Sequence, residues 1–365
     1  MESMVMSFAD KLSIYKGKRV LVTGHTGFKG SWLSIWLREL GAEVTGYALD
    51  PYTEEDNYVK CDLTNKITDH RGDLRDLEAL KHVFDVCQPE IVFHMAAQPL
   101  VLESYRDPKT TIDSNVWGTV NVLECCRASK SVKTIVNITS DKCYDNKEQL
   151  WGYKENDPMG GFDPYSASKG MVELLANSYR NSFFHPEKWK EHGKSLASVR
   201  AGNVIGGGDW AKDRIIPDCI RALLAGKAID IRNPKAVRPW QHVLEPLSGY
   251  LLLGALLHEK PTIYAEGWNF GPENSSVVPV GEIAEMVVNS FGEGSWQTNM
   301  DPNAPHEAKL LALDVSKAYF RLGWKPRWSV KEAISNTVAW YTENNKDANM
   351  YDLCKQQIEM FCKKD

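Results

Sequence analysis

Tyr165 and Lys169 are the residues whose types and spacing first suggest chemistry. They lie four residues apart in Asp163-Pro-Tyr-Ser-Ala-Ser-Lys169, and Ser140-Asp141-Lys142 lies a short way upstream. On a helix such a pair shares a face, so the lysine would place its charge beside a phenol whose free pKa is about 10 and favour the tyrosinate. With an upstream hydroxyl, this set suits proton and hydride transfer at a sugar carbinol. A tyrosine and a lysine at this spacing also arise by chance, so the assignment depends on other motifs.

A glycine-rich turn near the N-terminus predicts a dinucleotide site. It follows a buried strand expected over 18–23 and opens a helix, and a second strand over 43–48 leads to an aspartate. The glycines allow close backbone approach, and the helix N-terminus receives a pyrophosphate. The aspartate would hold the ribose hydroxyls and repel a 2′-phosphate, so we predict NAD rather than NADP. The predicted cofactor contacts here are Gly24, Gly27, Phe28, Gly30 and Asp50.

The composition fits a soluble enzyme. The 365 residues are 43% hydrophobic, and a net charge of -5 with scattered basic residues argues against nucleic acid. The first 18 residues lack the apolar core of a signal peptide, and the longest apolar run, 251–257, is too short to span a bilayer. The eight cysteines show no Cys-xx-Cys pair and no regular spacing. We therefore predict a cytoplasmic protein with reduced thiols, no metal site and no membrane or nucleic-acid partner.

Strands and helices alternate along the chain. Further strands are expected near 66–69, 90–94, 133–139, 196–201 and 262–270, and helices near 74–87, 109–129, 166–184, 214–225 and 247–258. This order predicts an α/β fold, a Rossmann-type doubly wound parallel sheet covered on both faces. Function in such sheets gathers at the carboxyl ends of strands, where Gly24, Asp50, Asp73, Gln98 and Ser140 fall.

With these motifs in place, the chain resembles the extended short-chain dehydrogenase/reductase family. Within it, the chain is similar to the nucleotide-sugar 4,6-dehydratases, above all to the branch that acts on CDP-glucose. The resemblance covers residues 17–340, and the segments that carry it are Thr23–Trp32, His94–Leu100, Asn137–Asn146, Gly152–Lys169, Val199–Trp210 and Arg238–Val243.

The resemblance implies a reaction in three stages on one bound NAD. Tyr165 takes the proton of the sugar 4-hydroxyl as hydride leaves C4, while Lys169 supports the tyrosinate and Ser140 holds the 4-oxygen. Water is then eliminated across C5 and C6, and hydride returns to C6. The elimination needs an acid and a base. Asp141 maps to the acid and Lys142 to the base, where most dehydratases of the family carry Asp-Glu.

The role of Lys142 has an alternative. A lysine starts with a pKa of about 10.4 and must lose its proton to act as a base. Burial or nearby positive charge would favour that loss. The alternative role is electrostatic, in which Lys142 only pairs with Asp141 or stabilises the developing enolate.

The same resemblance implies further binding residues. The cofactor contacts are Asp73, Leu74, Ala96 and Gln98, and the substrate contacts are Asn203, Asp209, Arg214 and Arg238. Plainer alternatives stay open: Asp73 could cap a helix, Asn203 could cap a turn and Arg238 could be a solvated surface charge. His306-Glu307 is a further candidate near the nucleotide, and Asn115 is left out of the site as structural.

We expect two interleaved parts and an assembly of subunits. Residues 1–185 form the NAD-binding domain, and strands near 196–203 and 262–270 return to its sheet. Residues 186–345 mainly build a smaller sugar-nucleotide lobe, and 346–365 form a polar helix or tail. In the resembling family the helices over 109–129 and 166–184 form the dimer surface, which implies a homodimer or a dimer of dimers.

Three other functions remain open: a dehydratase for another nucleotide-hexose, a nucleotide-sugar 4-epimerase and a non-catalytic NAD-sensing protein. An epimerase needs Tyr165 and Lys169 but no acid and base for C5 and C6, so Asp141-Lys142 argues against it. A sensing protein commonly lacks part of the hydroxyl, tyrosine and lysine set, which is complete here.

Overall fold

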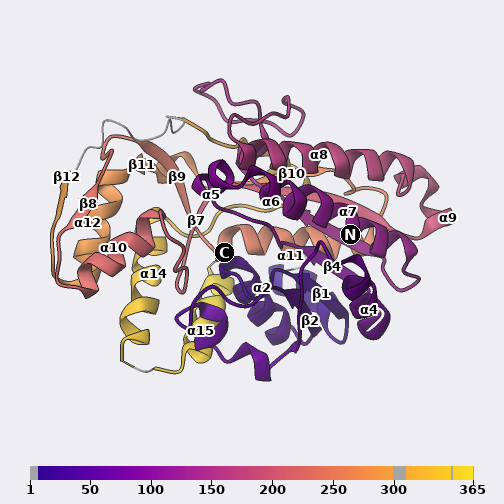
Figure 1. Cartoon of the computed structure of the whole chain (residues 1–365), viewed down its shortest axis with the longest axis horizontal. Helices are drawn as coiled ribbons and strands as arrows, with labels where there is room; N and C mark the ends of the chain where they lie inside the picture. Colours follow the sequence, from indigo (N-terminus) through magenta and orange to yellow (C-terminus); the bar gives the residue numbers. More distant parts are fainter. Residues whose placement is uncertain (1–6, 299–309, 347, 365) are drawn as a thin grey trace, which may run out of the picture.

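A seven-stranded parallel sheet forms the centre of the larger part of the molecule (Figure 1). The computed structural model describes residues 7–298, 310–346 and 348–364. The strands, in their order across the sheet, are β10 (Gly267–Phe270), β6 (Ser195–Ala201), β5 (Thr134–Ile138), β4 (Ile91–His94), β1 (Arg19–Thr23), β2 (Glu43–Ala48) and β3 (Thr68–Arg71). Helices cover both faces, which confirms the predicted doubly wound α/β fold.

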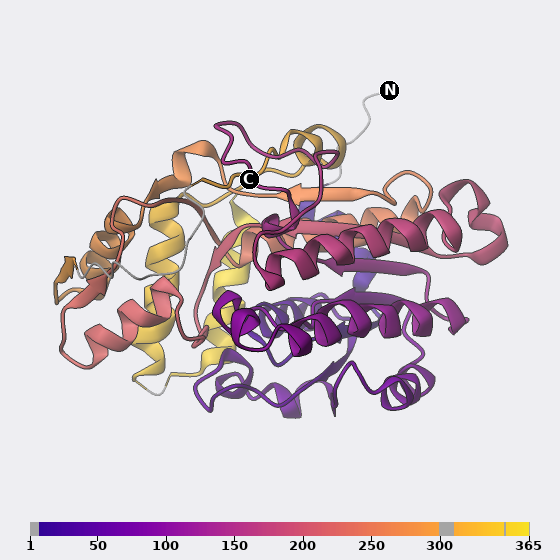
Figure 2. The same cartoon turned by 45° about the horizontal axis from the view of Figure 1, so that its top comes forward.

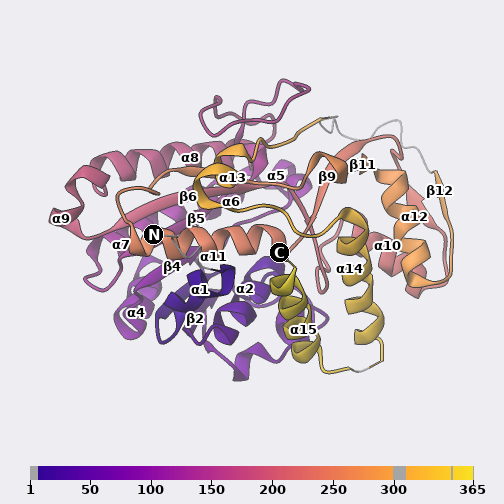
Figure 3. The ribbon, with the colours of Figure 1, turned by 180° about the vertical axis from the view of Figure 1, so that it is seen from behind.

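Alternating side chains divide the core into two layers. Val20 and Val22 of β1 point to one face of the sheet and Leu21 points to the other, as the two-residue period of a strand requires. The helices against the first face are α1 (Phe8–Leu12), α2 (Phe28–Glu39), α11 (Leu244–Glu259) and α15 (Met350–Lys363). Those against the second are α4 (Leu77–Cys87), α7 (Gly118–Ala128) and α8 (Pro164–Ser182). Figures 1 and 3 show the molecule from opposite sides.

A smaller lobe lies to one side of the main sheet (Figures 1 and 3). It holds a sheet of order β11-β9-β7 and the pair β12-β8. Its strands are β7 (Asn203–Ile205), β8 (Ile229–Ile231), β9 (Val237–His242), β11 (Val277–Pro279) and β12 (Trp296–Thr298), and its helices are α10 (Ile215–Leu224), α12 (Val280–Phe291) and α14 (Val330–Asn344). The chain crosses between the two parts, because α11 and β10 return to the large sheet between β9 and β11 of the lobe.

Short helices connect the larger elements. They are α3 (Asn57–Lys60), α5 (Val101–Arg106), α6 (Pro108–Ile112), α9 (Trp189–His192) and α13 (Ser316–Leu322). Figure 2 shows α7 and α8 running side by side along one face of the molecule.

Several of the predicted bounds differ from the structure; for example, α4 begins at Leu77 rather than at 74, and α11 begins at Leu244 rather than at 247. The strand expected over 262–270 contains only Gly267–Phe270, because Ile263 N donates to Lys260 O and Glu266 N donates to Tyr264 O, which closes turns before it. The helix expected over 109–129 is divided into α6, a π-helical turn over Asp113–Trp117, and α7. The strand expected over 66–69 lies two residues later.

The helix expected at the C-terminus is part of the core. Helix α15 buries Met350, Cys354, Ile358 and Phe361 against α2 and α14, so it is amphipathic rather than a polar tail. None of the helices in the described part of the chain combines the length and the apolarity that crossing a membrane requires.

Candidate active site

The glycine turn between β1 and α2 packs tightly against neighbouring backbone. A Cβ at Gly24 would lie 2.8 Å from the Ala96 backbone, and a Cβ at Gly30 would lie 2.0 Å from the Gly24 carbonyl oxygen. Helix α2 begins at Phe28 with Gly27 as its N-cap residue, and no side chain caps it. Its first N–H groups therefore have no side-chain acceptor and can receive a pyrophosphate. The free N–H groups at the start of α2 therefore fit the pyrophosphate of NAD.

Two carboxylates lie further along the same edge of the sheet. Asp50 follows β2 with its side chain 88% exposed, and its Oδ1 is 3.8 Å from the Arg71 guanidinium, so it is free to meet ribose hydroxyls. Asp73 follows β3 and pairs with Arg75 at 2.6 Å. The helix-cap alternative for Asp73 is wrong, because Asp76 caps α4 by accepting a hydrogen bond from Ala79 N.

The remaining predicted cofactor residues are held by the surrounding chain. Leu74 is buried against Gly118 at the start of α7. Gln98 Nε2 donates to Thr111 Oγ1 at 2.9 Å, and Gln98 N donates to Asn115 Oδ1 at 2.7 Å. Asn115 therefore ties the loop after β4 to the π-helical turn. Its position in a long predicted helix favours a structural role, and these hydrogen bonds show how that role supports the loop that carries Gln98.

Tyr165 and Lys169 lie on the first two turns of α8. Asp163 caps this helix by accepting hydrogen bonds from Ser166 N at 2.9 Å and Ser166 Oγ at 2.6 Å, and Pro164 occupies the first helical position. Lys169 Nζ lies 5.9 Å from the centre of the Tyr165 ring.

Ser140, Asp141 and Lys142 occupy a turn that follows β5, here called the 140–143 turn (Ser140–Cys143). Ser140 Oγ donates to Asp141 Oδ1 at 2.9 Å and accepts from Lys142 N at 3.3 Å. The Ser140 hydroxyl lies close enough to the Tyr165 phenol to lower the pKa of that phenol. The structure thus brings all five predicted catalytic residues to the junction of β5 and α8.

Burial has the largest effect on the protonation of this site. It raises the pKa of Tyr165 to about 12, although the Ser140 hydroxyl acts in the opposite direction. Burial lowers the pKa of Lys169 to about 8, and the Lys29 cation adds to that effect. In the protein alone the phenol pKa is therefore not lowered by Lys169, which differs from the expectation drawn from the spacing. Burial also raises the pKa of Asp141, which favours a carboxyl that still carries its proton.

Lys29 is a site residue that the sequence interpretation missed. It lies on the first turn of α2, and burial lowers its pKa to about 8, with the Arg214 cation acting in the same direction and the carboxylates of Asp141 and Asp209 opposing it. Among the described residues, no hydrogen bond or ion pair holds its ammonium group. The available signal was a lysine inside the predicted pyrophosphate-binding turn, Gly27-Phe-Lys-Gly30.

The small lobe supplies the predicted substrate residues. A Cβ at Gly202 would lie 2.9 Å from Asp141 Oδ2, which places the start of β7, and with it Asn203, beside the 140–143 turn. Asp209 is buried and accepts from Arg214 Nη1 at 2.7 Å, so this carboxylate holds Arg214 in place. Arg238 lies on β9, next to β7, and its guanidinium donates to Val237 O.

His306 and Glu307 fall outside the described residues. In the part of the chain that the structure describes, no group of three or more acidic, histidine or cysteine side chains could hold a metal ion.

A doubly wound sheet with a glycine turn, a hydroxyl, Tyr165 and Lys169 at one edge, and a second lobe beside them, defines an extended short-chain dehydrogenase/reductase. The sequence model of the GDP-mannose 4,6 dehydratase family matches residues 21–337, and the chain belongs to that family.

Individual relatives agree with this assignment. The chain is 51% identical over 347 residues to CDP-glucose 4,6-dehydratase of Salmonella typhimurium, covering 95% of this chain and 96% of that protein. Among solved structures it is similar to dTDP-glucose 4,6-dehydratase from Bacillus anthracis in complex with NAD, with a TM-score of 0.73, 21% identity, and 91% and 99% of the two chains covered. The epimerase Mth375 from Methanothermobacter thermautotrophicus gives a TM-score of 0.78 at 24% identity, with 96% and 97% covered. At these identities the two structures show the fold, which dehydratases and epimerases share.

Proposed function

We propose that this protein catalyses the NAD-dependent dehydration of CDP-D-glucose to CDP-4-keto-6-deoxy-D-glucose. The observation that carries the proposal is the 51% identity to CDP-glucose 4,6-dehydratase along almost the whole of both chains. The site agrees with it, because an acid and a cation, Asp141 and Lys142, lie beside the hydroxyl, tyrosine and lysine set. The assignment of the cytosine base and of glucose rests on the likeness alone.

Each residue of the candidate site has its own role in the reaction. NAD, when bound, supplies an acceptor for hydride from C4 and a donor of hydride to C6. Tyr165 accepts the proton of the 4-hydroxyl, Ser140 hydrogen-bonds the 4-oxygen, and Lys169 keeps a positive charge beside the phenol. Once C4 is a ketone the C5 hydrogen is acidic. The unprotonated amine of Lys142 removes it and returns a proton to C5 when hydride reaches C6. Asp141, whose pKa is raised by burial, gives a proton to the departing C6 hydroxyl.

The substrate diphosphate would lie where the lobe meets the sheet. Arg214 is held by Asp209 and lies close enough to Tyr165 for each charge to affect the other. Asn203 and Arg238 lie on neighbouring strands of the lobe. A guanidinium is a suitable partner for a diphosphate. We infer that residues 1–185 with β6 and β10 bind NAD, and that most of 186–345 binds the nucleotide sugar.

We also propose that the protein is a cytoplasmic homodimer or dimer of dimers. All eight cysteines are free thiols, as a reducing compartment requires. The helices that the resemblance assigns to the dimer surface carry exposed apolar side chains, namely Trp117 (59%), Met171 (46%) and Leu174 (62%).

Mass spectrometry of separate incubations with NAD and CDP-, dTDP-, UDP- or GDP-linked hexoses tests the proposal. Loss of one water from CDP-glucose alone is the expected result. Loss of water from another nucleotide sugar would support the dehydratase reaction and contradict the assignment of cytosine as the nucleobase. A new isomer without a change of mass would mean an epimerase, and no response to any of them would favour the sensing role.

A further inference from the structure

A buried ion pair lies behind the candidate active site. Arg200 Nη2 on β6 donates to Glu173 Oε2 on α8 at 2.8 Å, and the two side chains are only 6% and 4% exposed. Burying two charges costs more than their attraction returns unless the geometry is good and further hydrogen bonds satisfy both groups. The groups that form hydrogen bonds with Glu173 and Arg200 therefore indicate which part of the structure the ion pair supports.

The partners of this pair lie on both sides of the 140–143 turn. Thr139, immediately before the turn, donates through Oγ1 to the other oxygen of Glu173. Tyr144, immediately after the turn, accepts from Arg200 Nη1 at 2.6 Å and donates to Asn269 Oδ1 on β10 at 2.8 Å. One ion pair thus holds both ends of the segment that carries Ser140, Asp141 and Lys142.

The same ion pair also fixes the helix on which the other two catalytic residues lie. Glu173 is one helical turn beyond Lys169 on α8, so the two side chains share a face of that helix. The helix packs tightly on the turn at Gly170, where a Cβ would lie 2.3 Å from the Gly160 carbonyl oxygen and 3.3 Å from that of Cys143. Arg200 is anchored in turn, because its Nη1 also donates to Glu155 O at 3.0 Å.

We propose that Glu173 and Arg200 are positioning residues, which set the distance between the 140–143 turn and the Tyr165–Lys169 face of α8. The inference rests on the proposed function and adds to it, because C4 oxidation and C5/C6 elimination use groups from both sides of this junction. A displacement of about 1 Å between reacting groups can cost about 100-fold in rate. Loss of the pair is expected to lower kcat while substrate binding changes little, since neither residue belongs to the lobe that binds the nucleotide.

Glu173→Gln is the primary test, because it removes the charge and keeps the shape of the side chain. We expect kcat for CDP-glucose to fall by about 10- to 100-fold, with KM and the affinity for NAD within about threefold of wild type. In a single turnover followed by fluorescence, the variant should accumulate reduced cofactor to a different extent than wild type. The reason is that the groups for oxidation and the groups for elimination are no longer held at their normal distance from each other. Arg200→Met should produce the same defect, and the double variant should be little worse than either single one, since the pair acts as a unit.

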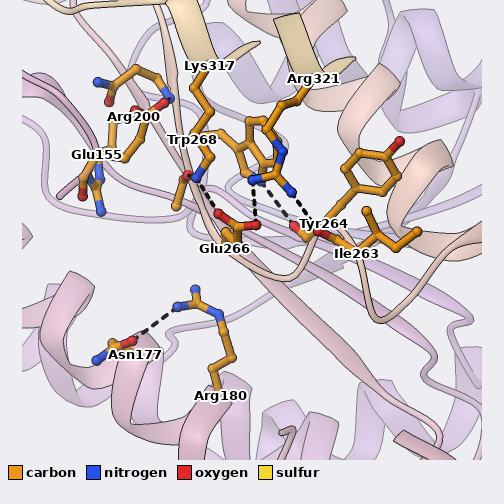
Figure 4. A network of polar contacts seen from close by, with 12 residues as sticks. Glu155, Asn177, Arg180, Arg200, Ile263, Tyr264, Glu266, Trp268, Lys317 and Arg321 are labelled. Atoms are coloured by element: carbon orange, nitrogen blue, oxygen red, sulfur yellow. Dashed lines mark hydrogen bonds and ion pairs between the residues drawn. The ribbon is translucent and has the colours of Figure 1, made fainter. Parts of the chain in front are cut away.

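A second carboxylate in the same region supplies the matched control. Glu266 accepts from Lys317 at 2.6 Å and from Arg321 at 2.7 Å and lines the same cleft behind α8 as Glu173 and Arg200 (Figure 4). It has no contact with the 140–143 turn among its hydrogen bonds and ion pairs. Glu266→Gln should therefore leave kcat, KM and the transient accumulation of reduced cofactor unchanged.

The outcomes separate the positioning role from the proposed function. A folded Glu173→Gln protein with wild-type kcat, while wild type dehydrates CDP-glucose, would overturn the positioning role and leave the proposed function intact. Absence of water loss with the wild type would overturn both. If the Glu173 and Arg200 variants do not fold, Tyr144→Phe removes a single hydroxyl from one end of the turn. It should lower kcat without changing KM, and an unchanged kcat in that variant would contradict the inference.

Discussion

At the residue scale, Lys29 changes the electrostatics of the candidate site. Together with burial, which has the larger effect, its ammonium lowers the pKa of Lys169 to about 8. The carboxylates of Asp141 and Asp209 lie close enough to oppose deprotonation of Lys29 itself. Lys29 therefore interacts electrostatically with Lys169 and with Arg214. The pH at which Lys169 loses its proton therefore depends on the charge of Lys29 as well as on burial.

Lys29→Met should move the alkaline side of the pH–rate profile to higher pH. Lys169 is cationic below its pKa and loses its charge as the pH rises through about 8. Removing a neighbouring cation raises that pKa, so the cationic form needed beside the phenol persists to higher pH. The measurement is kcat between pH 6 and 10, and a profile that coincides with wild type would mean that Lys29 does not affect Lys169.

The base role of Lys142 predicts a block after the first hydride transfer. In Lys142→Ala, Tyr165, Lys169 and Ser140 remain, so C4 oxidation should proceed and reduced cofactor should build up, while water loss falls by about 100-fold or more. Absorbance at 340 nm and mass spectrometry follow the two events. Tyr165→Phe is the control, since it should show neither event. Elimination at near wild-type rate in Lys142→Ala would contradict the base role, and a modest loss would favour the electrostatic one.

At the element scale, the start of α8 connects stability with chemistry. Tyr165 lies on the first helical turn, directly after the Asp163 cap and Pro164. The cap satisfies a backbone N–H of that turn and so fixes the conformation from which the phenol extends. Helix ends fray more easily than helix centres, so a catalytic side chain at this place depends on its cap.

Asp163→Ala should therefore reduce both stability and turnover. Loss of the hydrogen bonds to Ser166 is expected to cost about 1 kcal/mol of unfolding free energy. Urea unfolding measures this cost, and kcat should fall more than KM changes. Asp76→Ala, which removes the corresponding cap of α4 away from the chemistry, should give a similar loss of stability with normal turnover.

At the scale of the whole molecule, exposed apolar side chains are present on two neighbouring helical segments. Trp117, Met171 and Leu174 come from the segments before α7 and on α8, which run next to each other along one face (Figure 2). The Tyr165–Lys169 pair lies on the same helix α8. Pairing of two subunits through this face would therefore also brace the helix that carries the catalytic tyrosine.

Met171→Arg tests that assembly. A buried, unpaired charge at a subunit interface is costly, so the variant should shift the species seen by light scattering toward monomer. Phe320→Arg is the control, because Phe320 is also a large apolar residue, 81% exposed, but lies on α13. Equal masses for wild type and Met171→Arg would contradict a dimer through this face.

The sequence by itself determined those features that depend on neighbours in the chain. The glycine turn, the alternation of strands and helices, and the spacing of Tyr165 and Lys169 follow from local steric and periodic rules, and the doubly wound sheet follows from their order. The predicted start of β10 was wrong, and the helix predicted over 109–129 has the expected extent but contains a π-helical turn, because turns and π-helical turns depend on hydrogen bonds that composition does not show.

Only the tertiary structure decided which distant side chains meet. Lys29 lies near Asp141 and Arg214, and Glu173 pairs with Arg200, although these residues are far apart in the sequence. The C-terminal helix became part of the core because its apolar face packs on α2. The physical reason is common to all three. Burial and charge pairing are properties of the folded interior, and no periodicity along the chain shows which side chains will share that interior.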